Sequence, residues 1–123
     1  MKIDSWKQLE AYQVAFELQQ AVFRHSKKWP REETFSLTGQ VRRASRSIGT
    51  NLAEAWARRR YPDHFLSKLT DADAELQEAM HWISTANACG YLTLEHSSEL
   101  ESLAATVGRP LGSMINRHDS FCL

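Results

Sequence analysis

The sequence predicts an all-α protein, an antiparallel up-down-up-down four-helix bundle, and three observations support this fold class. Apolar residues recur at helical spacing along almost the whole chain, whereas alternating β-branched runs and Asn-Gly or Asp-Gly hairpin turns are absent. Proline, glycine and capping residues divide this pattern into four segments of similar length. The connections between the segments are short, which favours antiparallel neighbours. A chain of 123 residues has room for one domain, so we expect a single bundle over residues 1–123.

The first helix is expected over about residues 5–28. Ser5 and Gln8 have the spacing of a capping box, and Trp29-Pro30 ends the helix because proline disfavours helical geometry in the residue before it. Two adjacent apolar stripes cover about half of the helix circumference. One comprises Ala11, Val14, Ala15, Leu18 and Val22, and the other comprises Leu9, Tyr12, Phe16 and Phe23. This width is typical of a core helix; alternatively, the aromatic stripe packs against another subunit.

The second helix is expected over about residues 36–60, with Ser36 or Thr38 as its N-cap. It combines an apolar seam with two polar flanks. The seam comprises Leu37, Val41, Ala44, Ile48, Leu52 and Ala55; one flank carries Gln40, Arg43, Ser47, Asn51, Glu54 and Arg58, and the other carries Arg42, Arg46 and Arg60. The first flank is either a solvated face or a hydrogen-bonded contact between protein surfaces.

The third helix is expected over about residues 62–88, with Pro62 in its first turn and Gly90 just beyond its end. Its outward face carries acids and an indole, which is typical of an interface, and it complements the arginines of the second helix. We therefore predict an oligomer interface, unless the two faces meet within one bundle; between subunits, the contact would generate a closed ring or a filament. The predicted interface comprises Gln40, Arg43, Ser47, Asn51, Glu54, Glu75, Glu78 and Trp82.

The fourth helix is expected over about residues 94–116, with Thr93 as its N-cap. Pro110 lies inside this pattern, where proline removes a backbone donor and clashes with the preceding turn at a cost of ~3 kcal/mol or more. We therefore expect the fourth helix to be kinked or broken near Pro110. The tail, residues 117–123, is expected to fray.

The net charge is zero, but the charges are unevenly distributed along the chain. Residues 24–60 carry ten basic and three acidic side chains, a net charge of +7, whereas residues 61–123 carry three basic and nine acidic ones, a net charge of −6. Two basic clusters are candidate nucleic-acid contacts, and an antiparallel hairpin places them at opposite ends of the bundle. They are Arg24, Lys27 and Lys28, and Arg58, Arg59 and Arg60.

The sequence contains no motif for catalysis or cofactor binding. Walker, GxGxxG, HExxH and GxSxG motifs are absent, the histidines are scattered, and Cys89 and Cys122 form no CxxC pair. We predict no catalytic residues, no metal site and no cofactor. No segment approaches the roughly 20 apolar residues that span a bilayer, and the first residues do not resemble a signal peptide. We therefore expect a cytoplasmic protein without membrane association.

The motif of the second helix carries a family resemblance. It reads Phe35-x-Leu37-x-x-Gln40-x-Arg42-Arg43-Ala44-x-x-Ser47-Ile48-x-x-Asn51-Leu52-Ala53-Glu54, with Trp29-Pro30-x-Glu32-Glu33 upstream and Glu78-x-x-x-Trp82-x-x-x-Ala86-x-x-x-Gly90-Tyr91-Leu92 downstream. This pattern resembles that of the bacterial four-helix-bundle proteins encoded in 23S rRNA intervening sequences, and it is similar to that of the accessory variability proteins of diversity-generating retroelements. Gly49 stands where the family usually has proline, and Ala55 where it usually has glycine.

The resemblance implies an antiparallel four-helix bundle that assembles as a homopentamer. By analogy with the retroelement relatives, it also implies nucleic acid and a reverse transcriptase as partners. We therefore expect a non-enzymatic, homo-oligomeric binding or scaffolding protein that binds RNA or DNA through its basic clusters. The alternative is a protein–protein interaction module whose arginines serve only the subunit interface.

Overall fold

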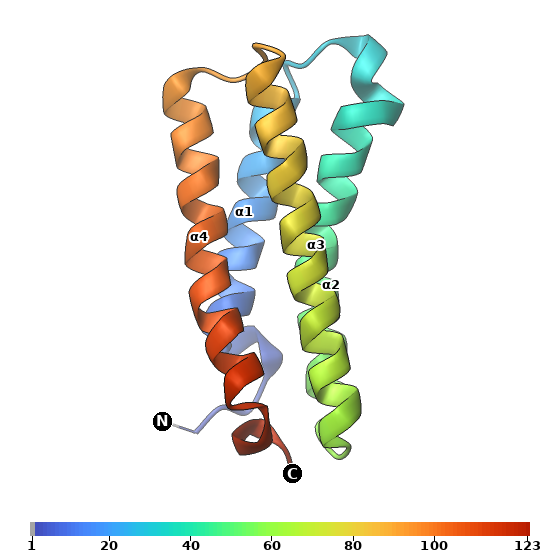
Figure 1. Ribbon diagram of the computed structural model, residues 1–123, viewed down its shortest axis with the longest axis vertical. Helices are drawn as coiled ribbons and strands as arrows, with labels where there is room; N and C mark the ends of the chain where they lie inside the picture. Colours follow the sequence, from blue (N-terminus) through green and yellow to red (C-terminus); the bar gives the residue numbers. More distant parts are fainter. Residues whose placement is uncertain (1) are drawn as a thin grey trace.

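The computed structural model describes residues 2–123, which form a four-helix bundle without strands in that range. Its helices are α1 (Glu10–Ser26), α2 (Gly39–Ala57), α3 (Pro62–Ala88) and α4 (Leu94–Asn116). They run alternately up and down, and both ends of the described chain lie at the lower end of the bundle in Figure 1. Each helix packs against two neighbours, in the order α1–α2–α3–α4 and back to α1. The predicted fold class is confirmed.

One continuous core joins the four helices. Each contributes fully buried aliphatic or aromatic side chains, such as Leu18 from α1, Ile48 from α2, Phe65 from α3 and Leu100 from α4. Burying one such side chain stabilises the fold by about 1.5–3 kcal/mol. The core leaves the polar flanks of the helices on the surface, where any binding site must lie.

The ends of α3 and α4 coincide with the limits that the sequence predicts. Pro62 is the first residue of α3, and Gly90 follows its C-cap with a φ of +79°, which suits a residue without Cβ. The hydroxyl of Thr93 accepts a hydrogen bond of 3.0 Å from the backbone N–H of His96. Local chemistry is therefore sufficient to set both ends of α3 and the start of α4.

α1 begins later than the sequence predicts. The hydroxyl of Ser5 accepts from the backbone N–H of Lys7, and Gln8 accepts from that of Asp4, but these bonds cap only the 3-10 turn η1 (Trp6–Gln8). The extended backbone of Leu9, with a ψ of 129°, separates this turn from α1. Leu9 is buried, so the bend places its side chain in the core instead of extending the helix.

α2 is shorter than predicted at both ends. A 3-10 turn η2 (Arg31–Glu33) and a π-helical turn η3 (Thr34–Thr38) precede it. Thr38 stands at the N-cap position of α2, as one of the two predicted caps, but its side chain makes no capping hydrogen bond within residues 2–123. Instead the carboxylate of Glu33 accepts from the backbone N–H of Leu37 and caps η3. At the other end α2 stops at Ala57, and the three following arginines lie in the turn to α3.

The expected break in α4 does not occur. α4 continues from Leu94 to Asn116 with Pro110 inside it. Pro110 provides no N–H for the carbonyl of Thr106, but buried residues on either side, Val107 and Leu111, anchor both halves of the helix in the core. Tertiary packing thus outweighs the local cost of the proline.

The C-terminal residues pack against the bundle rather than fray. They form the 3-10 turn η4 (His118–Phe121), in which the Phe121 ring lies 6.2 Å from that of Phe65. The backbone N–H of Leu123 donates to the carbonyl of Arg59 at 3.1 Å. The tail therefore covers the lower end of the core.

Candidate nucleic-acid interface

The residues predicted as an oligomer interface form a polar seam between α2 and α3 of the same chain. Arg43 donates to Glu75 at 3.0 and 3.3 Å and to Glu78 at 2.7 Å. The indole N–H of Trp82 donates to the same oxygen of Glu78 at 3.1 Å. Hydrogen bonds from Arg43 and Trp82 lower the pKa of Glu78, and the bonds to Glu75 and Glu78 raise the pKa of Arg43. The polar face of α2 and the acidic face of α3 therefore meet within one bundle, which is the alternative to a subunit interface that the sequence left open.

The lower part of the seam is also satisfied within the chain. Lys68 of α3 donates to Glu54 at 3.1 Å and to Asn51 at 3.4 Å. Ser47 donates to the carbonyl of Arg43 in its own helix, while Gln40 is exposed. The seam therefore needs no second subunit to pair its charges.

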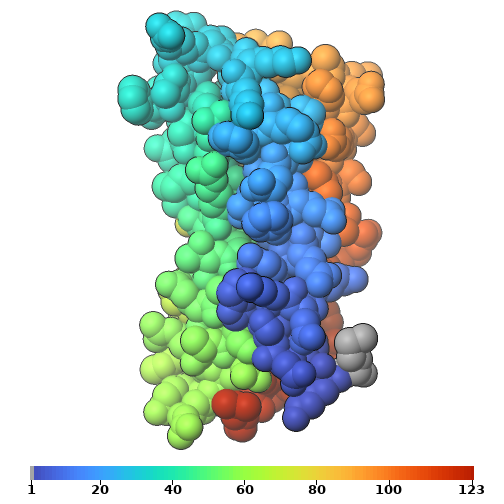
Figure 2. All heavy atoms as spheres, turned by 180° about the vertical axis from the view of Figure 1, so that it is seen from behind, coloured from blue at the N-terminus to red at the C-terminus, as the bar shows by residue number. Residues whose placement is uncertain are grey.

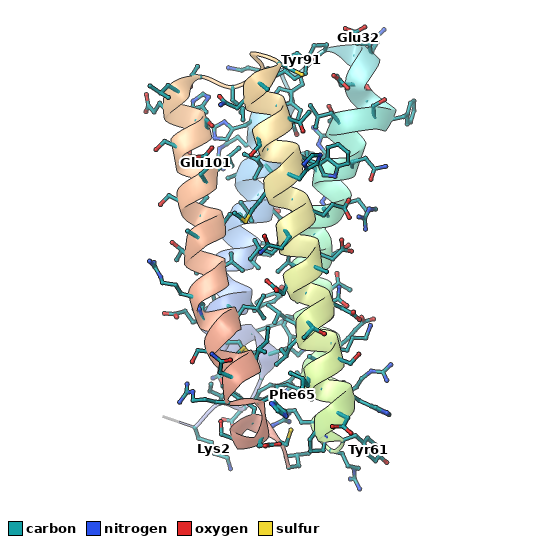
Figure 3. The ribbon with its side chains drawn as sticks, in the orientation of Figure 1. Lys2, Glu32, Tyr61, Phe65, Tyr91 and Glu101 are labelled. Carbon is teal, nitrogen blue, oxygen red and sulfur yellow. The ribbon has the colours of Figure 1, made fainter. Side chains whose placement is uncertain are left out.

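The two predicted basic clusters lie at opposite ends of the bundle, one after α1 and one after α2 (Figure 1). Tyr61, next to the second cluster, is labelled at the lower end of Figure 3, whereas Glu32 lies at the upper end. In the upper cluster, Arg24 is paired with Glu99 at 3.4 Å. In the lower cluster, Arg59 stacks on the ring of Trp56 at 3.6 Å. The structure does not bring the clusters together.

A third basic surface connects these ends, and we call it the α1–α2 face. It contains all five cation–π contacts found among residues 2–123. Figure 2 shows it from the front, with α1 in blue and α2 in cyan to green. None of its five cations forms an ion pair with a carboxylate in the described residues. The face comprises the cations Lys7, Lys27, Arg42, Arg46 and Arg59 with the aromatic residues Trp6, Tyr12, Phe16, Phe23 and Trp56.

Three of these cations surround one aromatic ring. Lys27, Arg42 and Arg46 lie 4.7, 4.8 and 5.5 Å from the centre of the Phe23 ring. Arg42 is held further by a hydrogen bond of 2.8 Å from its Nε to the hydroxyl of buried Ser26. Each cation–π contact contributes about 0.5–1 kcal/mol at an exposed site. Within residues 2–123 the terminal nitrogens of these three cations form no hydrogen bond or ion pair, so they can bind an anion.

No acid of α1 or α2 lines the groove on this face, although Glu17 borders a second groove that Phe16 shares. Glu10 and Glu17 line grooves on the α4 side of α1, and Glu54 pairs with Lys68 on the α3 side of α2. The local field of the α1–α2 face is therefore positive although the chain as a whole is neutral.

A groove lies on the α1–α2 face below the Phe23 ring. It has a volume of about 390 Å³. Phe16 at its edge is 45% exposed, and Tyr12 meets Trp6 edge-on at 4.7 Å. The groove is lined by Trp6, Tyr12, Phe16, Gln19, Arg46, Gly49, Thr50 and Ala53.

Sequence reasoning missed this face because its two halves belong to different helices. It placed Arg42 and Arg46 on one flank of the second helix, and Phe16 and Phe23 on an aromatic stripe of the first. The aromatic stripe of the first helix and the arginine flank of the second are each visible in the sequence. Only the packing of α1 against α2 shows that the stripe and the flank are adjacent.

Two further kinds of site are absent from residues 2–123. This range brings together no group of three or more His, Cys, Asp or Glu side chains that could hold a metal ion. It also contains no helix that is both long and apolar enough to cross a membrane.

Fold and surface together define the chain as an all-α bundle protein with a cation-rich aromatic face. A family model described as 23S rRNA-intervening sequence protein matches residues 7–113. The chain therefore belongs to the 23S rRNA-intervening sequence protein family, which confirms the resemblance seen in the second helix. A search among curated proteins finds no match.

Proposed function

We propose that this protein is a non-enzymatic, cytoplasmic, homo-oligomeric nucleic-acid-binding protein, and that its α1–α2 face contacts the phosphate backbone. One observation carries the proposal: five cations lie on aromatic rings along a single face, and none of them pairs with a carboxylate of the part of the chain that the structure describes. A phosphate that approaches such a cation displaces counterions but breaks no ion pair.

The arrangement of charge within the chain supports this proposal despite the zero net charge. Among residues 2–123, the basic side chains paired with carboxylates are Arg24, His25, Arg43, Lys68 and His118, and all of them lie outside the α1–α2 face. Several acids of α3 and α4 are used in these pairs. A polyanion therefore meets a positive surface on one side of the bundle and a largely neutralised polar seam on another.

Assembly would multiply the contacts of each chain. We propose a homo-oligomer, with a pentamer preferred, on the basis of the family resemblance. Phe35 is 93% exposed at the start of η3, and Leu94 is 86% exposed at the start of α4. These are two separate exposed apolar side chains at the upper end of the bundle, so the proposed assembly rests on the family resemblance. In a ring, the basic faces and the end clusters would repeat around the axis and bind one nucleic acid multivalently.

Substitutions on the α1–α2 face test the binding proposal. The double variant Arg42→Gln with Arg46→Gln should weaken binding of a structured RNA and of a duplex DNA at low salt by at least about tenfold, because two phosphate contacts are lost. The triple variant Arg58→Ala, Arg59→Ala and Arg60→Ala measures the contribution of the lower cluster. If the double variant binds as the wild type does, the α1–α2 face is not the binding surface.

The second candidate function is a protein–protein interaction module, and the exposure of Phe35 and Leu94 favours it. By analogy with the retroelement relatives, a reverse transcriptase is one candidate partner. In this case the oligomer would form without measurable affinity for either nucleic acid, even at low salt.

A further inference from the structure

We propose that the groove on the α1–α2 face binds an unpaired base of a single-stranded nucleic acid. This inference rests on the proposed function and names the class of nucleic acid that the face selects. A cationic surface alone does not distinguish a duplex from a single strand. A solvent-exposed aromatic ring distinguishes the two, because it can stack on an unpaired base, whereas the bases of a duplex are already stacked on one another.

Phe16 provides the stacking surface. Its side chain is 45% exposed, and its ring lies 6.3 Å from that of Tyr12, tilted by 32°. Tyr12 in turn meets Trp6 edge-on at 4.7 Å, so neighbouring rings support the platform. Aromatic side chains placed along a basic surface are the arrangement by which proteins bind single strands without sequence preference.

Gly49 lets the Tyr12 ring lie against α2. A Cβ at this position would lie 3.2 Å from Cε1 of Tyr12, closer than ordinary contact. With glycine, the ring forms a wall of the groove, whose volume of about 390 Å³ falls in the range of small-ligand sites. The groove is therefore large enough for one base and its sugar.

Polar groups at the groove match the rest of a nucleotide. Arg46 lines the groove and also reaches the Phe23 ring at 5.5 Å, so its guanidinium joins the base site to the cations around Phe23. The amide oxygen of Gln19 also lines the groove and accepts no hydrogen bond from residues 2–123, which leaves it free to accept one from a base edge. The positive charge of the α1–α2 face attracts the phosphates of a nucleic acid more strongly than it attracts a protein segment with few acidic residues.

The test compares two strands that differ only in their bases. We would measure fluorescence anisotropy with an oligothymidylate of about 20 nucleotides and with an abasic oligonucleotide of equal length and charge. The thymidine strand should bind roughly 5- to 100-fold more tightly, as expected for bases that stack on aromatic side chains. Phe16→Leu should remove most of this difference by weakening only the thymidine strand. Met80→Leu, a change at a similarly exposed apolar side chain (38%) between α3 and α4, away from the groove, should leave the difference unchanged.

A charge variant separates stacking from phosphate contact. Arg46→Gln should weaken both strands alike and reduce the slope of log affinity against log salt by about 0.7 for each lost single-strand phosphate contact. Circular dichroism of each variant verifies the helical fold.

Three results would overturn the inference. Equal, salt-sensitive binding of both strands would leave the proposed function standing and reject the base site. Absence of binding by either strand at low salt would reject both. A loss of oligomer mass in Phe16→Leu, with an unchanged ratio between the strands, would assign the groove to a contact with a second copy of the chain.

Discussion

At the scale of single residues, the pairing of Arg43 shows what a sequence can and cannot predict. Helical spacing correctly places Arg43 on one face of α2 and Glu75 and Glu78 on one face of α3. Spacing does not reveal whether two complementary faces meet in one chain or between chains, because both arrangements satisfy the same pattern. The structure brings them within 3.0 and 2.7 Å inside a single bundle.

The first prediction concerns Glu78. Its pKa is lower in the folded chain than its ordinary value because Arg43 and Trp82 donate hydrogen bonds to it. The ionised carboxylate therefore stabilises the fold above the unfolded pKa of about 4.3, and this stabilisation is lost as the pH falls through the lower folded value. Since the pair is partly exposed, the contribution should be about 1 kcal/mol or less.

Urea unfolding of the wild type and of Glu78→Gln at several pH values measures this contribution. The wild type should be more stable at pH 7, and the gap should close below about pH 4. A gap that stays constant from neutral to acidic pH would show that ionisation of Glu78 contributes nothing.

The second prediction concerns Tyr91, whose hydroxyl donates to Glu33 at 2.9 Å. This hydrogen bond raises the pKa of Tyr91 to about 12. The protonated phenol therefore stabilises the fold below its ordinary pKa of about 10, and the contribution is lost as the pH rises through about 12. Because Glu33 also caps η3, the bond ties the α3–α4 connection to the entry of α2.

An ultraviolet absorbance titration of the folded chain checks this assignment. Tyr91 should ionise near pH 12, and Tyr91→Phe should remove the absorbance step there. If that step persists in the variant, the bond to Glu33 does not control the titration.

At the scale of elements, the helices whose ends depend on local chemistry are those that the sequence predicts best. α3 and α4 begin and end at the expected positions because Pro62, Gly90 and Thr93 act through neighbouring backbone groups. The start of α1 differs because Leu9 is buried in the core, and that of α2 differs because Glu33, held by the hydroxyl of Tyr91 at 2.9 Å, caps the turn η3 that precedes α2. The sequence did not predict the α1–α2 face for a similar reason, because this face forms only when the two helices pack against each other.

The third prediction concerns Pro110 in α4. Pro110→Ala should stabilise the chain by about 1–3 kcal/mol, because alanine restores the N–H that the carbonyl of Thr106 lacks and removes the clash with the preceding turn. Thermal unfolding measures the change. Gly112→Ala calibrates it: a Cβ at that position meets nothing within 4 Å, so the gain should be about 0.5–1 kcal/mol. A loss of stability in Pro110→Ala would show that the proline itself is needed at this position.

At the scale of the whole molecule, the distribution of exposed apolar residues leads to the fourth prediction. Sedimentation equilibrium should show a mass several times 14.1 kDa, with five subunits preferred. Phe35→Ser should lower this mass if the exposed ring at η3 belongs to the subunit contact. A stable monomer in the wild type would reject the ring.

Charge also acts at this scale, since a chain of zero net charge presents one positive face. The basic segment and the acidic segment are visible in the sequence, but their opposition across the bundle is not. Glu10 and Glu17 of α1 border grooves toward α4, and Glu54 of α2 pairs with Lys68 of α3. No carboxylate among residues 2–123 forms an ion pair with the cations of the α1–α2 face. Its affinity for phosphate is the central claim of the proposed function.

The salt dependence of duplex DNA binding tests that claim most directly. Between 50 and 200 mM salt, the wild type should show a log–log slope of about −0.9 for each phosphate it neutralises. Arg42→Gln with Arg46→Gln should make the slope shallower by about two such contacts, whereas Arg109→Gln with Arg117→Gln, which removes the same charge from the C-terminal part of α4, should leave it unchanged. Equal slopes for the wild type and the α1–α2 variant would contradict the account.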